Sequence, residues 1–145
     1  MITMDDFFID ALRNARVIAV VGASDKPHRP SHRTARYLKE AGYRVIPVNP
    51  HCERVMDDPC YPDLLSIPKE EHIDIIDIFR NAAHTAEVVR QAIERMKETG
   101  EHPIIWTQIG ASSEEAQELA RAAGLPYVSN RCLMIEHAHR IGPPD

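Results

Sequence analysis

The chain has 145 residues, a net charge of −5, 43% hydrophobic residues and 27% charged residues, which predicts one soluble globular domain over residues 1–145 rather than a disordered or fibrous chain. No apolar run reaches the ~18–20 residues that span a bilayer, and residues 1–10 carry acids where a signal peptide carries cations, so neither feature is expected. The acidic balance argues against broad nucleic-acid binding, and the three cysteines, too few and odd in number for a disulfide framework, favour the reducing cytoplasm.

Short β-rich segments alternate with longer helical patterns along the chain. An N-terminal segment, residues 1–14, carries a predicted helix from residue 4 and precedes a core over residues 15–140. The predicted strands cover residues 16–21, 44–48, 73–79, 103–106 and 126–128. The first of them, RVIAVV, has the continuous apolar and β-branched character of a strand buried on both faces. Pro47 weakens the second, because proline cannot donate a hydrogen bond to a sheet ladder.

The helical patterns have recognisable ends. Predicted helices cover residues 31–41, 82–97, 112–124 and 132–140. In the first, Ser31 is expected to be the N-cap and Gly42 the C-terminal stop. In the third, Ser112 and Glu115 form a capping-box pattern, and Gly124 ends the helix.

Strands that alternate with helices of this length predict right-handed βαβ crossovers, and therefore an α/β fold with a doubly wound, parallel, five-stranded sheet. Ligands of such sheets bind outside the carboxyl ends of the strands, where the strand order reverses. The segments expected at that edge are residues 22–31, 49–50, 79–81 and 108–110.

The loop after the first strand, VVGASDKPHRPSH, combines several features of a phosphate site. Gly22 permits a tight turn and a close approach of the backbone to a ligand. The amides at the start of the following helix favour an anion. Cationic and titratable side chains gather here, against the single acid Asp25: Lys26, His28, Arg29, His32 and Arg33. The loop therefore predicts a ligand with several phosphates, the alternative being a solvated basic surface.

This loop is neither a standard dinucleotide fingerprint nor a Walker A loop. Ser24 and Pro27 occupy positions where a GxGxxG pattern needs glycine, and no GK[ST] follows. NAD-binding domains usually end their second strand with an acid that holds the ribose diol, whereas this chain has Asn49 followed by Pro50. NAD is therefore disfavoured, and NADP or another phosphorylated adenosine remains.

Five motifs in this order resemble those of the stand-alone CoA-binding domain proteins, which are similar to the N-terminal domain of the succinyl-CoA synthetase α subunit. The matching segments are residues 20–32 (VVGASDKPHRPSH), 42–50 (GYRVIPVNP), 77–80 (DIFR), 106–110 (WTQIG) and 130–137 (NRCLMIEH). The resemblance implies a Rossmann-like domain that binds coenzyme A or acyl-CoA. The phosphate-carrying histidine of the synthetase lies in a second domain that has no counterpart here, so the resemblance implies binding without acyl-CoA synthesis.

The resemblance also assigns residues to parts of the ligand. Those expected around the diphosphate are Gly22, Ala23, Ser24, Lys26, Pro27, Arg29 and Ser31. Those expected beside the adenosine and its 3′-phosphate are Asn49, Pro50 and the turn that follows them. Those expected over the adenine or the start of the pantetheine arm are Phe79, Arg80 and Asn81. Those expected along the arm toward the thiol are Gln108, Asn130, Arg131 and Cys132.

Other functions stay open at this stage. An NADP-dependent oxidoreductase fragment is the main alternative, and a regulatory interaction protein with a vestigial nucleotide site is another. No catalytic set is identified, since a solvated helix face explains His84 and Glu87 equally well. Besides CoA, a protein partner or a homo-oligomer is left open, and no membrane or nucleic-acid partner is expected.

Cysteine and histidine patterns do not predict a metal site. The spacing of His51, Cys52 and Cys60 matches no compact zinc pattern.

Cys132 is expected to be a packing residue, with a mixed disulfide to CoA as the lesser alternative. Trp106 is expected in the core. Asp77 is expected to contact either the ligand or a helix amide.

Overall fold

The computed structural model describes residues 2–144, so residue 1 of the expected N-terminal segment and residue 145 of the expected domain lie outside the described residues. The helices are α1 (Met4–Asn14), α2 (Pro30–Glu40), α3 (Ala82–Thr99), α4 (Glu114–Ala122) and α5 (Leu133–Arg140), with a short 3₁₀ helix η1 (Leu64–Ser66). The strands are β1 (Val17–Val21), β2 (Arg44–Val48), β3 (Arg54–Val55), β4 (Asp58–Pro59), β5 (Ile75–Ile78), β6 (Ile104–Thr107) and β7 (Tyr127–Val128). Over residues 2–144, no helix is both long and apolar enough to cross a bilayer.

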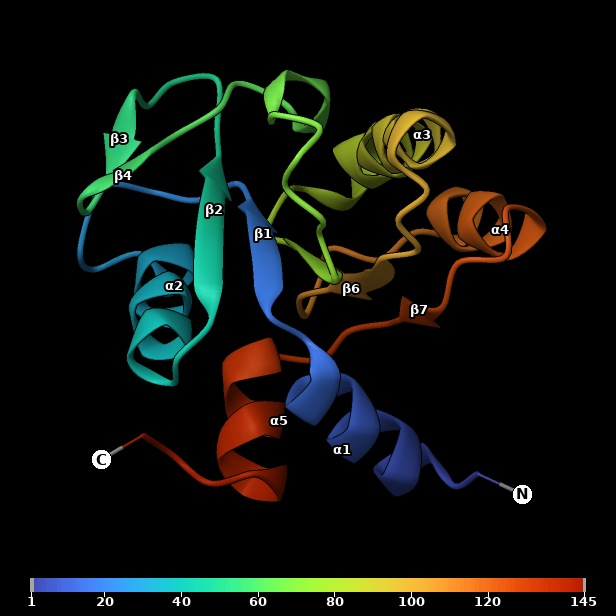
Figure 1. The fold of residues 1–145 in the computed structure, drawn as a ribbon, viewed down its shortest axis with the longest axis horizontal. Coiled ribbons are helices and arrows are strands. Elements are labelled where there is room, and N and C mark those ends of the chain that lie inside the picture. Colours follow the sequence, from blue (N-terminus) through green and yellow to red (C-terminus); the bar gives the residue numbers. More distant parts are fainter. Residues whose placement is uncertain (1, 145) are drawn as a thin grey trace.

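Five parallel strands form the central sheet in the order β2-β1-β5-β6-β7, and β3 pairs with β4 as a separate antiparallel hairpin. The chain runs outward from β1 to β2, then crosses back to β5 on the other side of β1. In Figure 1, α3 and α4 lie on one side of the sheet and α2 on the other, with α1 and α5 near the amino end of β1. The predicted doubly wound α/β fold is therefore confirmed.

The strand β1 shows why its sequence is apolar throughout. Ile18 and Val20 belong to one buried cluster, which includes residues of α1, α2 and α5, whereas Ala19 and Val21 belong to another, which includes residues of α3 and α4. A strand covered on both faces has no position for an exposed polar side chain. Trp106 is completely buried in the first cluster, as predicted, and its Nε1 donates to the Arg131 carbonyl at 2.9 Å.

Pro47 lies within β2 because this strand is at the edge of the sheet. Its carbonyl points outward, where it accepts a hydrogen bond from the Tyr61 amide at 3.1 Å. The nitrogen and carbonyl of one strand residue point to the same side, so the missing proline N–H also faces away from β1 and interrupts no ladder bond.

Two predicted N-caps are wrong by one or two positions. The helix α2 begins at Pro30 with Arg29 as its N-cap, so Ser31 lies inside the first turn. Proline suits the first helical position because its missing N–H needs no partner there. The helix α4 has Ser113 as its N-cap, whereas the Ser112 hydroxyl forms a hydrogen bond with the Tyr127 hydroxyl at 2.9 Å.

The predicted third strand is too long at its start, and the reason is Asp74. Its carboxylate accepts hydrogen bonds from the amides of Arg16 and Val17 at 2.8 and 3.0 Å. This contact fastens the chain just before β5 to the start of β1, and the regular strand begins only at Ile75.

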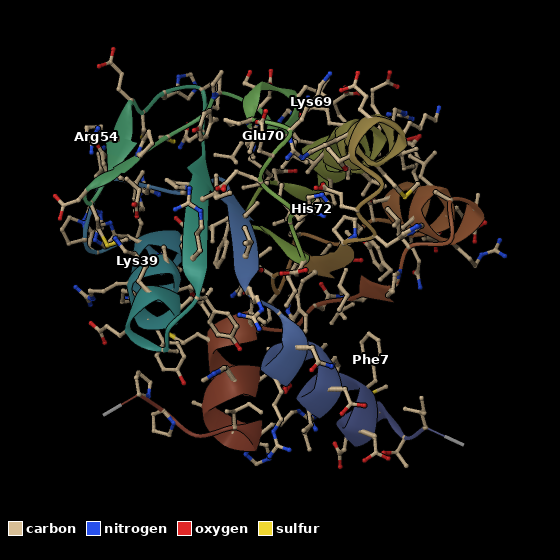
Figure 2. The ribbon with its side chains drawn as sticks, viewed as in Figure 1. Phe7, Lys39, Arg54, Lys69, Glu70 and His72 are labelled. Carbon is tan, nitrogen blue, oxygen red and sulfur yellow. The ribbon has the colours of Figure 1, made fainter. Side chains whose placement is uncertain are left out.

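The connection between β2 and β5 carries the β3–β4 hairpin and η1 (Figure 1). Figure 2 shows Lys39 on α2 and Arg54 on the hairpin, and the Lys39 ammonium lies 2.8 Å from the Asp58 carboxylate of β4. This ion pair fastens the first half of the connection to α2.

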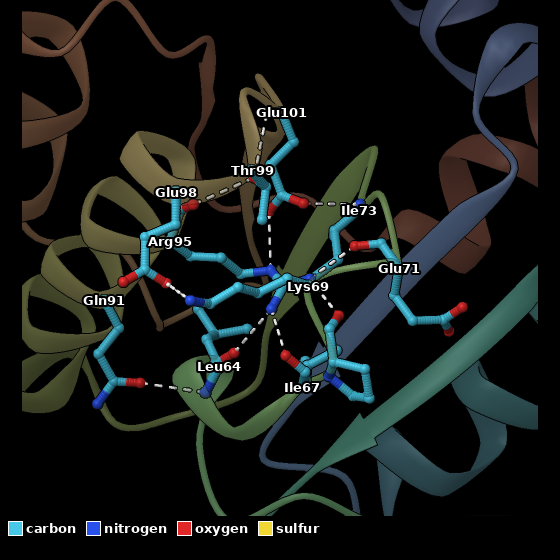
Figure 3. Close-up of polar contacts among 11 residues, drawn as sticks. Leu64, Ile67, Lys69, Glu71, Ile73, Gln91, Arg95, Glu98, Thr99 and Glu101 are labelled. Carbon is cyan, nitrogen blue, oxygen red and sulfur yellow. Dashed lines mark hydrogen bonds and ion pairs between the residues drawn. The ribbon is translucent and has the colours of Figure 1, made fainter.

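The second half is held by a buried arginine of α3 (Figure 3). Arg95 is 1% exposed, and its Nε lies 3.1 Å from the Glu101 carboxylate. The remaining guanidinium donors bond to carbonyls of the connection, those of Leu64, Ile67, Pro68 and Glu71. Glu101 in turn accepts from the Ile73 amide at 3.1 Å. One side chain thus supplies hydrogen-bond donors to carbonyls of an irregular segment that has no strand partner.

Arg95→Ala should lower the free energy of unfolding by about 3–5 kcal/mol, because it leaves the Glu101 carboxylate buried without its counter-charge. The matched control is Lys69→Ala, which removes an exposed pair with Glu98 (Figure 3) and should change stability by about 0.5 kcal/mol or less. Urea denaturation of both variants measures the difference, and equal losses would contradict a special role for Arg95.

Asp77 of β5 is completely buried, and neither carboxylate oxygen has a hydrogen-bond partner among residues 2–144. The expected bond to a helix amide is therefore not present in the described chain. Burial raises the pKa of this carboxyl well above its usual value, because the charged form would lose its hydration.

Asp77→Asn should make the protein more stable than the parent, by a margin that grows with pH. Below about pH 4 the carboxyl is protonated in both folded and unfolded chains, and above it only the unfolded chain ionises, so parent stability falls by up to about 1.4 kcal/mol per pH unit. Urea denaturation between pH 4 and 8 measures the margin, with the exposed Asp10→Asn as control. A stability margin that does not change with pH would contradict a raised pKa of the buried Asp77 carboxyl.

Candidate functional site

A cavity of about 770 Å³ opens at the carboxyl ends of β1, β2, β5 and β6. Its wall comes from the segments that follow these four strands, the same segments that the sequence placed at this edge. The predicted site residues that line it are Gly22, Ser24, Lys26, Arg29, Ser31, Asn49, Phe79, Arg80, Asn81 and Gln108.

The cavity is suited to an anion. Residues at the N-termini of α2 and α3 line it, and α2 has no side-chain cap, so the Ser31 amide of its first turn remains available, whereas the His32 and Arg33 amides donate to the Arg29 carbonyl. Lys26, Arg29 and Arg80 add cationic side chains, and Asp25 is the one acid in the wall.

A second cavity, of about 690 Å³, lies at the amino ends of β1 and β2, where helices end rather than begin, although Arg13, Arg16 and Arg44 also line it. It is lined by the C-terminal ends of three helices, at Asn14, Ala41 and Ile141. Carbonyl groups at helix C-termini repel anions, so the helix dipoles favour a phosphorylated ligand only at the carboxyl edge.

Gly22 shapes the loop after β1. Its φ is +90°, and a Cβ at this position would lie 3.0 Å from the Phe79 carbonyl oxygen. The amides of Gly22 and Ala23 both donate to the Val48 carbonyl, at 2.8 and 3.3 Å. This turn brings the loop over the end of β2 and buries the Ala23 side chain in the core.

Asn49 connects two parts of the wall. Its Nδ2 donates to the Ala23 carbonyl at 2.6 Å, and its Oδ1 accepts from the His51 amide at 2.8 Å. Both polar groups of the side chain are therefore engaged by protein. Asn49 positions the loop after β1 against the turn after β2, in addition to lining the cavity.

His32 fixes the other half of the loop. Its side chain is buried, and Nδ1 lies 2.8 Å from the Ser24 carbonyl. The Ser24 hydroxyl accepts from the Lys26 amide at 3.1 Å. His32 thus holds the loop from its buried side, while Lys26 and Arg29 line the cavity.

In the segment after β5, Asn81 caps α3 by accepting a hydrogen bond from the Ala83 amide at 2.9 Å. Arg80 lines both the main cavity and a smaller adjoining one of about 110 Å³. His84 and Glu87 lie in the smaller cavity, together with Pro50, so this titratable pair and the main cavity are separate.

Some predicted residues do not line the main cavity, namely Ala23, Pro27, Pro50, Asn130, Arg131 and Cys132. The Asn130 Oδ1 accepts from the Gly110 amide at 3.1 Å and so supports the turn after β6. Arg131 pairs with Glu136 at 2.9 Å. Cys132 is 7% exposed at the start of α5.

The wall also contains residues that the sequence reasoning did not assign to the ligand, namely Asp25, Pro30, His51, Cys52, Ile109, Gly110 and Ala111. Asp25, Pro30, Ile109 and Gly110 lie within the segments that were expected at this edge, although none was assigned to a part of the ligand. His51 and Cys52 lie in the turn after Pro50, which the resemblance placed beside the adenosine. Their place depends on how the chain turns after Asn49.

The comparisons with known proteins identify the family of the chain. The family model described as a CoA binding domain matches residues 16–138. The uncharacterized protein YneT of Bacillus subtilis is 31% identical over 129 residues, which cover 89% of this chain and 90% of that protein. The subunit alpha of an ADP-forming acetate–CoA ligase II of Pyrococcus furiosus is 29% identical over 141 residues, which cover 90% of this chain but only 30% of the subunit.

A solved structure shows the same fold over nearly the whole chain. A hypothetical protein from Pyrococcus horikoshii matches with a TM-score of 0.89 and 39% identity, covering 97% of this chain and 94% of that one. Chains of this size with the same fold therefore occur without the other regions of the ligase subunit.

Gly22→Ala should lower the free energy of unfolding by about 2–4 kcal/mol, because a side chain is strained at this φ and also meets the Phe79 carbonyl. The control is Gly124→Ala, whose φ is +78° but whose Cβ would meet open space, with an expected loss of about 1–2 kcal/mol. Urea denaturation compares the two. A loss at Gly22 no larger than at Gly124 would contradict the close approach.

Proposed function

Because the chain belongs to the CoA binding domain family, we propose that it binds coenzyme A or an acyl-CoA in the cavity at the carboxyl edge of its sheet. One observation carries the proposal. The family match covers residues 16–138, and the same residues form a cavity with two helix N-termini and a local excess of cations in a chain of net charge −5.

The diphosphate is assigned to the loop after β1. Lys26 and Arg29 supply charge, and the uncapped first turn of α2, at Ser31, supplies a backbone donor. Charge-assisted hydrogen bonds of this kind are stronger than neutral ones and suit phosphate oxygens. The positive φ of Gly22 allows the loop to approach the ligand without a side chain in between.

The adenosine is assigned to the space between the turn after β2 and the segment after β5. Asn49, His51 and Cys52 form one wall, and Phe79 and Arg80 form the other. An aromatic ring suits the face of a purine, and the Arg80 guanidinium suits a 3′-phosphate. No acid stands at the end of β2 to repel that phosphate.

The pantetheine arm is assigned to the turn after β6. Gln108, Ile109 and Ala111 line this end of the cavity, and Ile109 is 66% exposed there. The arm alternates apolar carbons with amide groups, which a mixture of apolar and amide side chains suits. The assigned role is binding, and a reaction at the thiol is not part of the proposal.

Thermal unfolding with coenzyme A, dephospho-CoA, NADP, NAD and ATP tests the proposal. A ligand at 100 times its dissociation constant adds ~2.7 kcal/mol of stability, a shift of about 5–10 °C for a chain of this size. Coenzyme A should give the largest shift and dephospho-CoA a smaller one. A larger shift with NADP would favour the oxidoreductase alternative, and equal shifts with all five would indicate only a nonspecific anion site.

The double variant Lys26→Ala/Arg29→Ala should bind coenzyme A about 10- to 100-fold more weakly, because it removes two charge-assisted contacts to the diphosphate. Titration calorimetry measures the affinity. The control is Arg36→Ala, which removes a charge from an exposed position of α2 outside the cavity and should leave the affinity within about twofold. Equal losses in the two variants would mean that general charge, not the loop, attracts the ligand.

A further inference from the structure

Two cysteines flank the β3–β4 hairpin. Cys52 precedes β3 and Cys60 follows β4, and the hairpin pairing continues beyond the strands because the Cys60 amide donates to the Glu53 carbonyl at 2.9 Å. Cys60 therefore lies opposite Glu53, which is the residue next to Cys52 in the chain. Both side chains are half-buried and pack against the same apolar cluster, the one that contains Val55.

One oxygen atom brings the two cysteines together. The Asn49 carbonyl accepts a hydrogen bond from the Cys60 thiol at 3.6 Å and another from the Cys52 amide at 3.4 Å. A disulfide needs α-carbons within about 7 Å of each other, a distance met by residues at adjoining positions of an antiparallel pair. The charge of Cys52 acts on Cys60, and closing the disulfide requires the turn at Cys52 to move until the two sulfur atoms are in contact.

The two thiols differ in accessibility. Cys52 lines the main cavity, where a small solute from solvent can reach it. Burial raises the pKa of Cys60 to about 11, and the negative charges of the Cys52 thiolate and Asp25 add to the effect. Cys60 is therefore protonated at neutral pH, and Cys52 is the thiol that an oxidant meets first.

We propose that a peroxide oxidises Cys52 and Cys60 to an intramolecular disulfide that weakens ligand binding, an effect on the ligand that rests on the proposed function. The Cys52 thiolate attacks one peroxide oxygen, the O–O bond breaks, and one water leaves as a sulfenic acid forms. Cys60 gives up its proton and attacks that sulfur, so that the S–S bond forms and a second water leaves. Two thiols and one hydrogen peroxide thus give one disulfide and two waters, with two electrons passing from sulfur to oxygen.

The link from the disulfide to the ligand runs through Asn49. Oxidation removes the Cys60 thiol that donates to the Asn49 carbonyl. The side chain of Asn49 holds the loop after β1 through Ala23 and the turn after β2 through His51. Loss of about one hydrogen bond from this arrangement corresponds to a roughly fivefold weaker affinity.

Peptide mapping tests the disulfide itself. The protein is treated with hydrogen peroxide, free thiols are blocked, and the chain is cut with trypsin, which cleaves after Arg54 and so separates the two cysteines. The expected product is a pair of peptides joined by a disulfide between Cys52 and Cys60, in a protein lighter by about 2 Da. The Cys132→Ala variant should give the same product, and Cys52→Ala and Cys60→Ala should not.

Titration with acetyl-CoA, which has no free thiol to reduce the disulfide, tests the effect on binding. Peroxide should weaken the affinity of the parent and of Cys132→Ala about fivefold, and reductant should restore it. The affinity of Cys60→Ala should not respond to peroxide. Absence of the joined peptides, or an oxidised parent that binds as well as the reduced one, would overturn the inference. Failure of the reduced parent to bind acetyl-CoA would instead overturn the proposed function, and the peptide map would still test the cysteine pair.

Discussion

The reversal of strand order at β1 is the constraint on which the rest of the structure depends. Since β2 and β5 lie on opposite sides of β1, the segments that leave these strands diverge and leave a hollow between them. The same geometry directs the N-termini of α2 and α3 to the hollow. The helix dipoles and the shape at this edge therefore share one topological origin, and helices end rather than begin at the opposite edge.

A hollow made of loops is useful only if the loops are held in place. Here side chains that bond to the backbone fasten the loops of the wall: His32 holds the carbonyl of Ser24, Asn49 holds that of Ala23, and Asn130 accepts from the Gly110 amide. The cations Lys26 and Arg29, which line the cavity, can then remain exposed without loss of order in the backbone that carries them. His32 thus only positions the loop after β1, whereas Asn49 both positions it and lines the cavity.

The sequence was sufficient for the parts that depend on periodicity and chain order. Apolar β-branched runs identified all five strands of the sheet, and the positions after them identified most of the cavity wall. The sequence did not predict the contacts of single side chains. Neither the burial of Arg95 nor the bond from Asn49 to the Ala23 carbonyl follows from local pattern, because each joins segments far apart in the chain. The N-cap of α4 was misplaced because Ser112 and Ser113 are equally good candidates, and that of α2 because Pro30 takes the first helical position and leaves Arg29 as the N-cap.

The outer side of β2 is already occupied along the chain itself. The Tyr61 amide bonds to Pro47, the Asn49 amide bonds to Tyr61, and Pro47 offers no donor of its own, while the other edge strand, β7, has only two residues. An exposed edge invites another strand to extend the sheet, and these features block that mode of self-association at both ends. Copies of this chain that assemble would have to meet through helices and loops, so that each protomer keeps a separate five-stranded sheet.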